Sequence, residues 1–174
     1  MICPRCGNEN IEGMDRCDNC MEPLRDRDVP QSAKGFQRLI MEEPVSTLIH
    51  SSPAIVAADT TVAEAIRQMK KDRLGCVIVA EDGLLTGIFT ERDVLLKLAG
   101  ERRNLEELTV GDVMTPSPDR VEAEDSLRFA LNKMSVGGFR HIPVTDEGRV
   151  TGIVTAKDAL NFIAREAIYK EGRQ

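Results

Sequence analysis

The chain contains the same sequence unit twice. Aligning the sequence with itself at an offset of 65 residues matches residues 45–96 to 110–161 without a gap. The shared positions form phrases, such as "TGIFTERD" at 86–93 and "TGIVTAKD" at 151–158. Each copy is too small to cover its own apolar face, so the other copy in the chain has to cover it. We therefore expect two like-built halves that pack into one pseudo-symmetric module.

The hydrophobic pattern of each copy predicts a strand, a helix, a hairpin and a second helix. In the first copy, a short apolar run precedes a helical stripe over 60–75, and two apolar runs are joined by Glu81-Asp82-Gly83, a hairpin pattern. Helical spacing resumes after Thr90. The second copy repeats this order, so the predicted fold class is α+β.

Composition narrows the classes of partner. The chain has 174 residues with 41% hydrophobic content, no Trp and one Tyr, so it offers few aromatic platforms on which bases could stack. A net charge of −6 argues against a broad phosphate-binding face. No apolar run reaches the ~20 residues of a membrane span, and the N-terminal residues lack an apolar leader. We expect a cytoplasmic protein whose partners are small molecules or proteins.

Four of the five cysteines form two Cys-x-x-Cys pairs, Cys3/Cys6 and Cys17/Cys20. Two such turns can direct four thiolates at one tetrahedral Zn²⁺, and Gly7 suits the left-handed backbone that these turns need. Four thiolates leave no open coordination position, so the predicted role of zinc is structural. Iron in a rubredoxin-like site, or two disulfides, are the alternatives.

Residues 1–28 resemble the zinc ribbons of many prokaryotic proteins. Such ribbons often contact nucleic acid, but this segment has four arginines against seven acidic residues, a net side-chain charge of −3. That surface would repel phosphates. We interpret the ribbon as a protein-contact or dimer-stabilising element, and a nucleic-acid-binding ribbon regulated by the repeats is the alternative.

Four segments follow from these patterns. They are a zinc ribbon at 1–28, a linker with a short helix at 29–44, and two repeat units at 45–109 and 110–174.

The repeats resemble a tandem pair of cystathionine-β-synthase (CBS) domains, called a Bateman module. The phrases that carry the resemblance are "VMTPSPDRVEAEDSL", "GGFRHIPVTDEGRVTGIVTAKDAL" and, more weakly, "GCVIVAEDGLLTGIFTERDVL". It implies two pseudo-symmetric β-α-β-β-α units in one module, commonly dimeric, that bind AMP, ATP or S-adenosylmethionine in clefts between units. Proteins of this family are mostly regulatory sensors. The family's ribose and phosphate motif corresponds to Thr90 and Asp93, and to Thr155 and Asp158.

A physical argument supports the same residues. A strand that runs directly into a helix at Thr155 brings free backbone N–H groups and the positive end of the helix dipole together. Asp158 could accept both hydroxyls of a ribose. The same Thr-x-x-Asp pattern is also close to a capping box, and both roles can hold.

The two sites are expected to differ. In the second copy Arg140 and His141 open the middle strand, where the family often has basic contacts to phosphate, whereas Gly75 and Cys76 occupy the aligned positions of the first copy. Taken singly, Arg140 reads as a solvated surface charge and His141 as a satisfied interior imidazole. Phosphate at the first site would have to be met by Arg92, Lys157 or the partner unit. We expect the site of Thr155, Asp158 and Arg140 to be the one that fills.

These features predict a non-enzymatic sensor of adenosine nucleotides (AMP, ADP, ATP or S-adenosylmethionine) that signals to an unknown protein partner. Only His50 and His141 are available for acid–base catalysis, and no phosphate-binding loop or nucleophile elbow is present. Cys76 lies in an apolar run and is expected to be a core thiol. The last helix has more apolar surface than one packing face requires, which suggests a homodimer.

Overall fold

The structure, a computed structural model, describes residues 2–3, 5–10, 16–22, 42–49, 53–100 and 103–171. The predicted short helix after residue 35 and most of the linker lie outside these residues. The chain forms two compact units. Unit 1 comprises Met1–Leu48, Glu124–Arg140 and Thr155–Gln174, and unit 2 comprises Ile49–Ala123 and His141–Val154. The two units are defined by which residues lie in contact with one another, whereas the predicted ranges 45–109 and 110–174 are defined by the sequence repeat.

The strands form one sheet with the order β1-β2-β3-β7-β6-β5, and β4 pairs with β3. The pairings β1–β2 and β5–β6 are parallel, and β2–β3, β3–β4 and β3–β7 are antiparallel. The strands are β1 Ile55–Val56, β2 Cys76–Glu81, β3 Leu84–Thr90, β4 Thr115–Pro116, β5 Val121–Glu122, β6 His141–Asp146 and β7 Arg149–Thr155.

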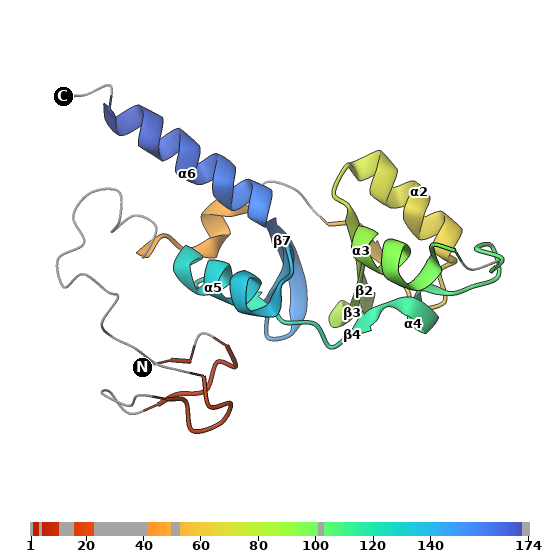
Figure 1. Cartoon of the computed structure of the whole chain (residues 1–174), viewed down its shortest axis with the longest axis horizontal. Helices are drawn as coiled ribbons and strands as arrows, with labels where there is room; N and C mark the ends of the chain where they lie inside the picture. Colours follow the sequence, from red (N-terminus) through yellow and green to blue (C-terminus); the bar gives the residue numbers. More distant parts are fainter. Residues whose placement is uncertain are drawn as a thin grey trace. The chain divides into compact units, whose positions relative to one another are not determined.

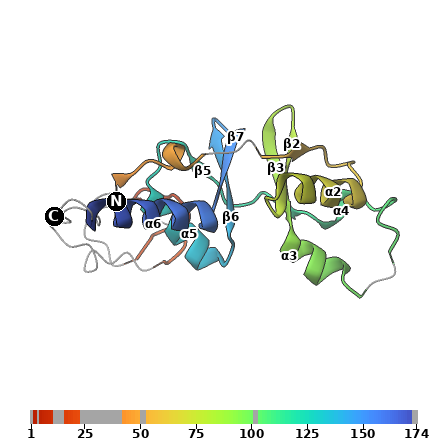
Figure 2. The ribbon, with the colours of Figure 1, turned by 90° about the horizontal axis from the view of Figure 1, so that it is seen from above.

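Each copy contains the predicted hairpin, β2–β3 and β6–β7 (Figure 2). Both turn residues of each hairpin have positive φ, 50° and 82° at Asp82 and Gly83, and 48° and 81° at Glu147 and Gly148. This is the backbone of a type I′ turn, which favours Gly at the second position. The Glu-Asp-Gly pattern therefore predicted the turn correctly.

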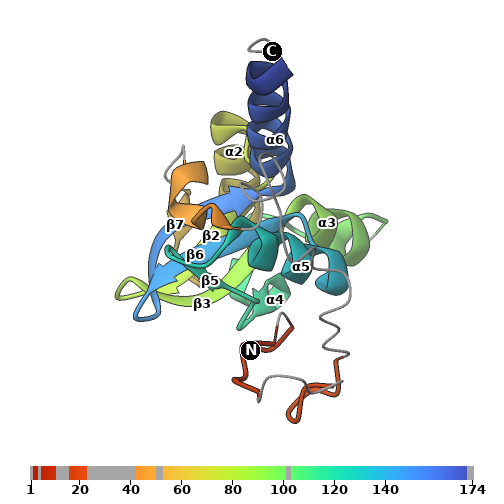
Figure 3. The same cartoon turned by 90° about the vertical axis from the view of Figure 1, so that its left-hand side faces the viewer.

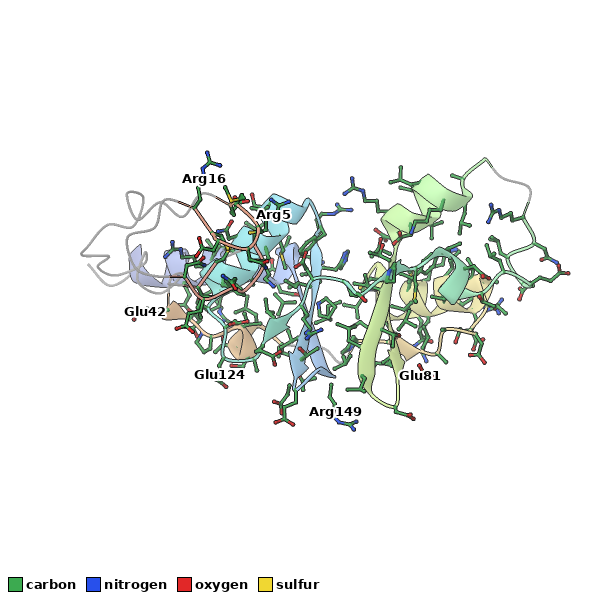
Figure 4. All side chains as sticks on the ribbon, turned by 90° about the horizontal axis from the view of Figure 1, so that it is seen from below. Arg5, Arg16, Glu42, Glu81, Glu124 and Arg149 are labelled. Atoms are coloured by element: carbon green, nitrogen blue, oxygen red, sulfur yellow. The ribbon has the colours of Figure 1, made fainter. Side chains whose placement is uncertain are left out.

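The two hairpin tips are hydrogen-bonded to each other in unit 2 and lie side by side (Figure 3). Leu85 N–H donates to the Gly148 carbonyl at 3.0 Å, and Val150 N–H donates to the Gly83 carbonyl at 3.0 Å. An offset of 65 residues converts one bond into the other, so the contact is pseudo-twofold. Arg149, at the tip in Figure 4, adds a 2.8 Å bond from Nη1 to the Asp82 carbonyl. The predicted α+β module of two like-built halves is confirmed.

The helices of unit 2 pack around β2 and β3 (Figure 1). They are α2 Val62–Asp72, α3 Glu91–Asp93, η3 Val94–Leu98 and α4 Val110–Val113. The apolar stripe of α2 is buried as its spacing predicts, with Val62 and Ala65 0% exposed and Met69 5% exposed. The buried core around them comprises Ala54, Val62, Ala65, Met69, Val77, Val79, Phe89, Leu98, Val110 and Val113.

The helix after Thr90 differs from the regular helix that its spacing predicts. It begins as α3 and continues as the π-helical turn η3, in which Ala99 N–H donates to the Val94 carbonyl at 3.0 Å. A π turn widens the helix and changes which side chains share a face. Lys97 lies on this turn.

In unit 1 the helix α6 Ala156–Glu171 contacts both α5 Leu127–Gly137 and the short 3-10 helix η2 Val45–Leu48 (Figure 3). The hydroxyl of Ser126 caps α5 by accepting from Phe129 N–H at 3.3 Å. Gly138 ends this helix in the left-handed conformation with φ 65°.

The segment that precedes each repeat pairs with the helix start of the other repeat. Four backbone hydrogen bonds show this exchange. In unit 1, Val45 N–H donates to the Asp125 carbonyl at 2.8 Å and Leu127 N–H donates to the Glu43 carbonyl at 2.7 Å. In unit 2, Val110 N–H donates to the Thr60 carbonyl and Val62 N–H to the Leu108 carbonyl, both at 2.8 Å. The 65-residue offset relates the first pair to the second. Because each lead-in joins the opposite repeat, contact units and sequence repeats divide the chain differently.

No helix in the described part of the chain has the length and apolar character required to cross a membrane.

Candidate functional site

The second Thr-x-x-Asp motif forms a reciprocal cap where β7 meets α6. The N–H and the hydroxyl of Thr155 both donate to Oδ2 of Asp158, at 2.9 and 2.7 Å. Asp158 N–H donates back to the Thr155 hydroxyl at 3.1 Å. The predicted cap is therefore present, and it uses only one of the two carboxylate oxygens.

The other oxygen of Asp158, Oδ1, has no hydrogen-bond partner within the described residues. The side chain is half-buried, and the acceptor therefore remains available at the first turn of a 16-residue helix. The carbonyl of Arg140 accepts from Ala156 N–H at 2.9 Å, which places the backbone of Arg140 beside the start of α6. Arg140 and Lys157 are both exposed. Unit 1 thus gathers an open anionic acceptor and two cationic residues around one helix start.

His141, the other predicted residue of this motif, lies in unit 2. Its ring is half-buried, and Nε2 is 3.0 Å from the Leu74 carbonyl, which only a ring N–H can satisfy as donor. This bond joins the two repeats. The sequence suggested that His141, taken singly, is an interior imidazole with its hydrogen bonds satisfied, and the bond to Leu74 satisfies Nε2 in that way.

The first Thr-x-x-Asp motif has the same cap where β3 meets α3, in unit 2. The N–H and the hydroxyl of Thr90 donate to Oδ2 of Asp93 at 2.9 and 2.8 Å. Here, however, Oδ1 of Asp93 is also engaged, by Lys97 Nζ at 2.7 Å and by the Thr115 hydroxyl at 3.4 Å. Arg92 lies on the same short helix and is exposed. The first carboxylate is therefore satisfied by the protein itself.

Asp93 is only 7% exposed, and its electrostatics follow from this arrangement. Burial raises its pKa, but the hydrogen bond and charge of Lys97, together with the bonds from Thr90, lower it on balance below its usual value. The carboxylate is thus held ionised by its neighbours.

Sequence reasoning missed Lys97 and Thr115. The spacing of Asp93 and Lys97, four residues apart on a helix, could have indicated the ion pair. The contact with Thr115 depends on the exchanged lead-in and leaves no mark in the sequence.

A third Thr-x-x-Asp cap shows what the motif does without a strand before it. At the start of the four-residue helix α4, the N–H and hydroxyl of Thr109 donate to Oδ2 of Asp112 at 3.1 and 2.6 Å. The side-chain and backbone hydrogen bonds from Thr109 lower the pKa of Asp112. Capping is therefore common to all three motifs and does not by itself mark a ligand site.

The four predicted cysteine ligands lie together in unit 1. The Sγ atoms of Cys3, Cys6, Cys17 and Cys20 are all within 4.8 Å of one another, with Cys3–Cys20 and Cys6–Cys17 at 3.5 Å. Four sulfurs at 2.3 Å from one tetrahedral ion would be about 3.8 Å apart. A disulfide needs about 2.05 Å. The arrangement fits a metal ion and does not correspond to two disulfides.

The two cysteine turns share one backbone geometry. The carbonyl of Cys3 accepts from Gly7 N–H, and that of Cys17 accepts from Met21 N–H, both at 2.9 Å. Gly7 has the predicted positive φ, 72°, and Met21 adopts φ 60° at the matching position. Burial raises the pKa of Cys17, but the backbone N–H groups of Cys20 and Asn19 and the adjacent thiols lower it to about 6. Burial raises the pKa of Cys3, and burial together with the adjacent thiols raises that of Cys20 to about 12, so without a metal the negative charge is concentrated on Cys17.

Cys76, the remaining cysteine, is a core thiol as predicted. It is 1% exposed and packs with Ile78, Ile88 and Ile153. Burial, and then the charge of Glu91, raise its pKa to about 12.

Comparison with known proteins decides the family. The model of the CBS domain matches residues 45–100 and 110–165, more than half of the chain. The chain belongs to the CBS-domain family. The tandem CBS pair predicted from the repeats is confirmed.

Relatives share the pair but differ in length. CBS domain-containing protein CBSCBSPB1 of Arabidopsis thaliana is 35% identical over 126 residues, which are 71% of this chain and 23% of that protein. A CBS-domain-containing protein from Agrobacterium tumefaciens has a crystal structure that is 30% identical with a TM-score of 0.63, covering 70% of this chain and 98% of that chain. A Pyrobaculum aerophilum CBS domain protein, crystallised with AMP, is 21% identical with a TM-score of 0.63 and the same coverage, which establishes likeness of fold.

Proposed function

We propose that this CBS pair is a non-enzymatic regulatory protein that binds an adenosine nucleotide at the second Thr-x-x-Asp motif. The observation that carries the proposal is the open Oδ1 of Asp158 at the start of α6. A carboxylate oxygen in this position accepts from a ribose hydroxyl, and the start of a long helix favours the negative charge of a phosphate. Arg140 and Lys157, exposed near the same helix start, supply positive charge for that phosphate.

The Pyrobaculum protein crystallised with AMP supports the choice of ligand class, because it shares this fold. AMP, ADP, ATP and S-adenosylmethionine all carry the ribose that Asp158 would bind. They differ in charge, so the two cationic residues favour the phosphate-bearing members.

We propose that the four-cysteine cluster holds one structural zinc ion. The thiolates of Cys3, Cys6, Cys17 and Cys20 would complete its tetrahedral coordination and stabilise a segment that has little apolar core of its own. The ribbon would then present a rigid surface to a protein partner. Its acidic balance, visible in the sequence, disfavours nucleic acid.

The last helix supports a homodimer as the form in which the signal is read. Leu160 on α6 is 64% exposed while Phe162, two residues further, is 6% exposed. An exposed leucine on a helix that already buries one face is a candidate for contact with a second copy. Sedimentation showing a monomer at micromolar concentration would contradict this part of the proposal.

A thermal-shift panel tests the ligand. AMP, ADP, ATP and S-adenosylmethionine at millimolar concentration should raise the melting temperature, because a ligand that binds only the native state stabilises it. Inorganic phosphate at the same ionic strength is the control for nonspecific anion effects. Folded protein that melts at the same temperature with every nucleotide would refute the proposed function.

A further inference from the structure

The two Thr-x-x-Asp motifs that follow a strand differ one helical turn after the aspartate. The 65-residue offset places Lys97 of the first repeat opposite Phe162 of the second. Phe162 is 6% exposed and belongs to the packed face of α6. The first repeat therefore has a cation where the second has a core residue.

The ammonium group of Lys97 is fully used inside the first site. It lies 2.7 Å from Asp93 Oδ1, 2.6 Å from the Val113 carbonyl and 3.3 Å from the Met114 carbonyl. Three N–H groups thus meet three acceptors, although the side chain remains 40% exposed. The corresponding oxygen of Asp158 in the second repeat has no such partner among the described residues.

The start of the first helix also carries an acidic side chain that the second lacks. Glu91 is the first residue of α3, and its carboxyl group lies against Gly75, where an added Cβ would be only 2.9 Å from Glu91 Cδ. At the aligned positions of the second repeat stand Ala156 and Arg140. The first helix start therefore has an acidic side chain against Gly75, whereas the second repeat has Arg140 at the position aligned with that glycine and no acid at the position aligned with Glu91.

We infer that Lys97 and Glu91 close the first site to nucleotide. The ammonium group of Lys97 is held at the carboxylate oxygen of Asp93 that a ribose would otherwise use. Each chain therefore binds one nucleotide, at the second repeat. This inference rests on the proposed function. It assigns Lys97 and Glu91 as the residues that determine stoichiometry. The carboxylate of the first repeat is then satisfied by the protein itself, and the first repeat has a structural role beside the second.

Isothermal titration with ADP tests the inference on the full chain. Wild type should bind one ADP per chain, and Asp158→Asn should weaken that binding at least about tenfold, because it removes a charged acceptor. The double variant Glu91→Ala/Lys97→Met should bind a second ADP. Lys70→Met, which removes an exposed lysine on α2, is the matched control and should still bind one. An unchanged dissociation constant at the second site shows that the double variant and Lys70→Met remain folded, and an unchanged melting temperature without nucleotide shows the same for Asp158→Asn.

The outcomes separate the inference from the function on which it rests. Two ADP per wild-type chain, or a double variant that still binds one, would overturn the role of Lys97 and Glu91 while nucleotide binding stands. One ADP that is unaffected by Asp158→Asn would place the ligand elsewhere and also overturn the inference. No ADP bound by any variant would remove the proposed function and the inference together.

Discussion

The substitution Asp158→Asn isolates the open oxygen from the cap. An asparagine oxygen can still accept from the N–H and hydroxyl of Thr155, so the capping bonds to α6 are retained. The amide NH₂ replaces the open Oδ1, and a donor then stands where a ribose hydroxyl needs an acceptor. Losing a hydrogen bond to a charged group costs about 1.5–3 kcal/mol, which is roughly 10–150-fold in affinity.

The melting temperature converts this loss into a direct measurement. At a nucleotide concentration of about 100 times its dissociation constant, wild type gains about 2.7 kcal/mol, or roughly 5–11 °C for a chain of this size. At the same concentration Asp158→Asn should gain only about 0.3–1.4 kcal/mol, or roughly 1–6 °C. Differential scanning fluorimetry across a nucleotide titration measures both values.

Asp112→Asn is the matched control, because Asp112 forms the same cap on α4 with Thr109. It should leave the nucleotide-dependent shift at its wild-type value. Equal shifts for wild type and Asp158→Asn would refute the role of the open oxygen, and a shift lost equally in both variants would show that capping, not ligand contact, had been measured.

Three further predictions concern the metal, the buried carboxylate and the sheet. Native mass spectrometry should find one zinc ion per chain in wild type and none in Cys17→Ser, because this variant lacks one of the four thiolate ligands. Finding iron, or no metal, in wild type would contradict this prediction. Because the pKa of Asp93 in the folded chain lies below its usual 3.8, its stabilisation is present above that pH and is lost as pH falls through the folded value. Asp93→Asn should therefore unfold with a smaller loss of stability between pH 5 and 3 than wild type, and an identical loss would count against the ion pair. Gly152→Ala should lower the free energy of unfolding, measured in urea, by about 1–3 kcal/mol, because its Cβ would lie 2.7 Å from Cγ2 of the β-branched Ile49. Gly87→Ala should lower it less, because its Cβ meets the flexible side chain of Met114. Equal losses of stability in the two variants would contradict this packing.

Much of the fold could be predicted because it depends on local chemistry that occurs twice. The hairpin turns follow from Asp82-Gly83 and their second-copy equivalents, which suit positive φ. The caps follow from the Thr-x-x-Asp spacing. The cluster of four cysteines could be predicted because the Cys-x-x-Cys spacing brings two thiols together in each of two short turns.

The remainder depends on which copy each segment joins. Because the two repeats are similar, each lead-in has two possible partners, and the sequence does not reveal that Val110 pairs with the first-copy residue Thr60. The closure of the first site depends on that exchange, because Lys97 reaches the Val113 and Met114 carbonyls from a π turn. Sequence reasoning expected the two sites to differ from the basic residues alone, and the lysine at Asp93 gives a physical cause.

A crystal structure of the full chain with ADP tests the central claim most directly. We predict a ribose hydroxyl within about 2.5–3.0 Å of Asp158 Oδ1, phosphates at the start of α6, and Lys97 still paired with Asp93. Nucleotide density at Asp93 with Lys97 displaced, or ADP bound away from both aspartates, would contradict the account.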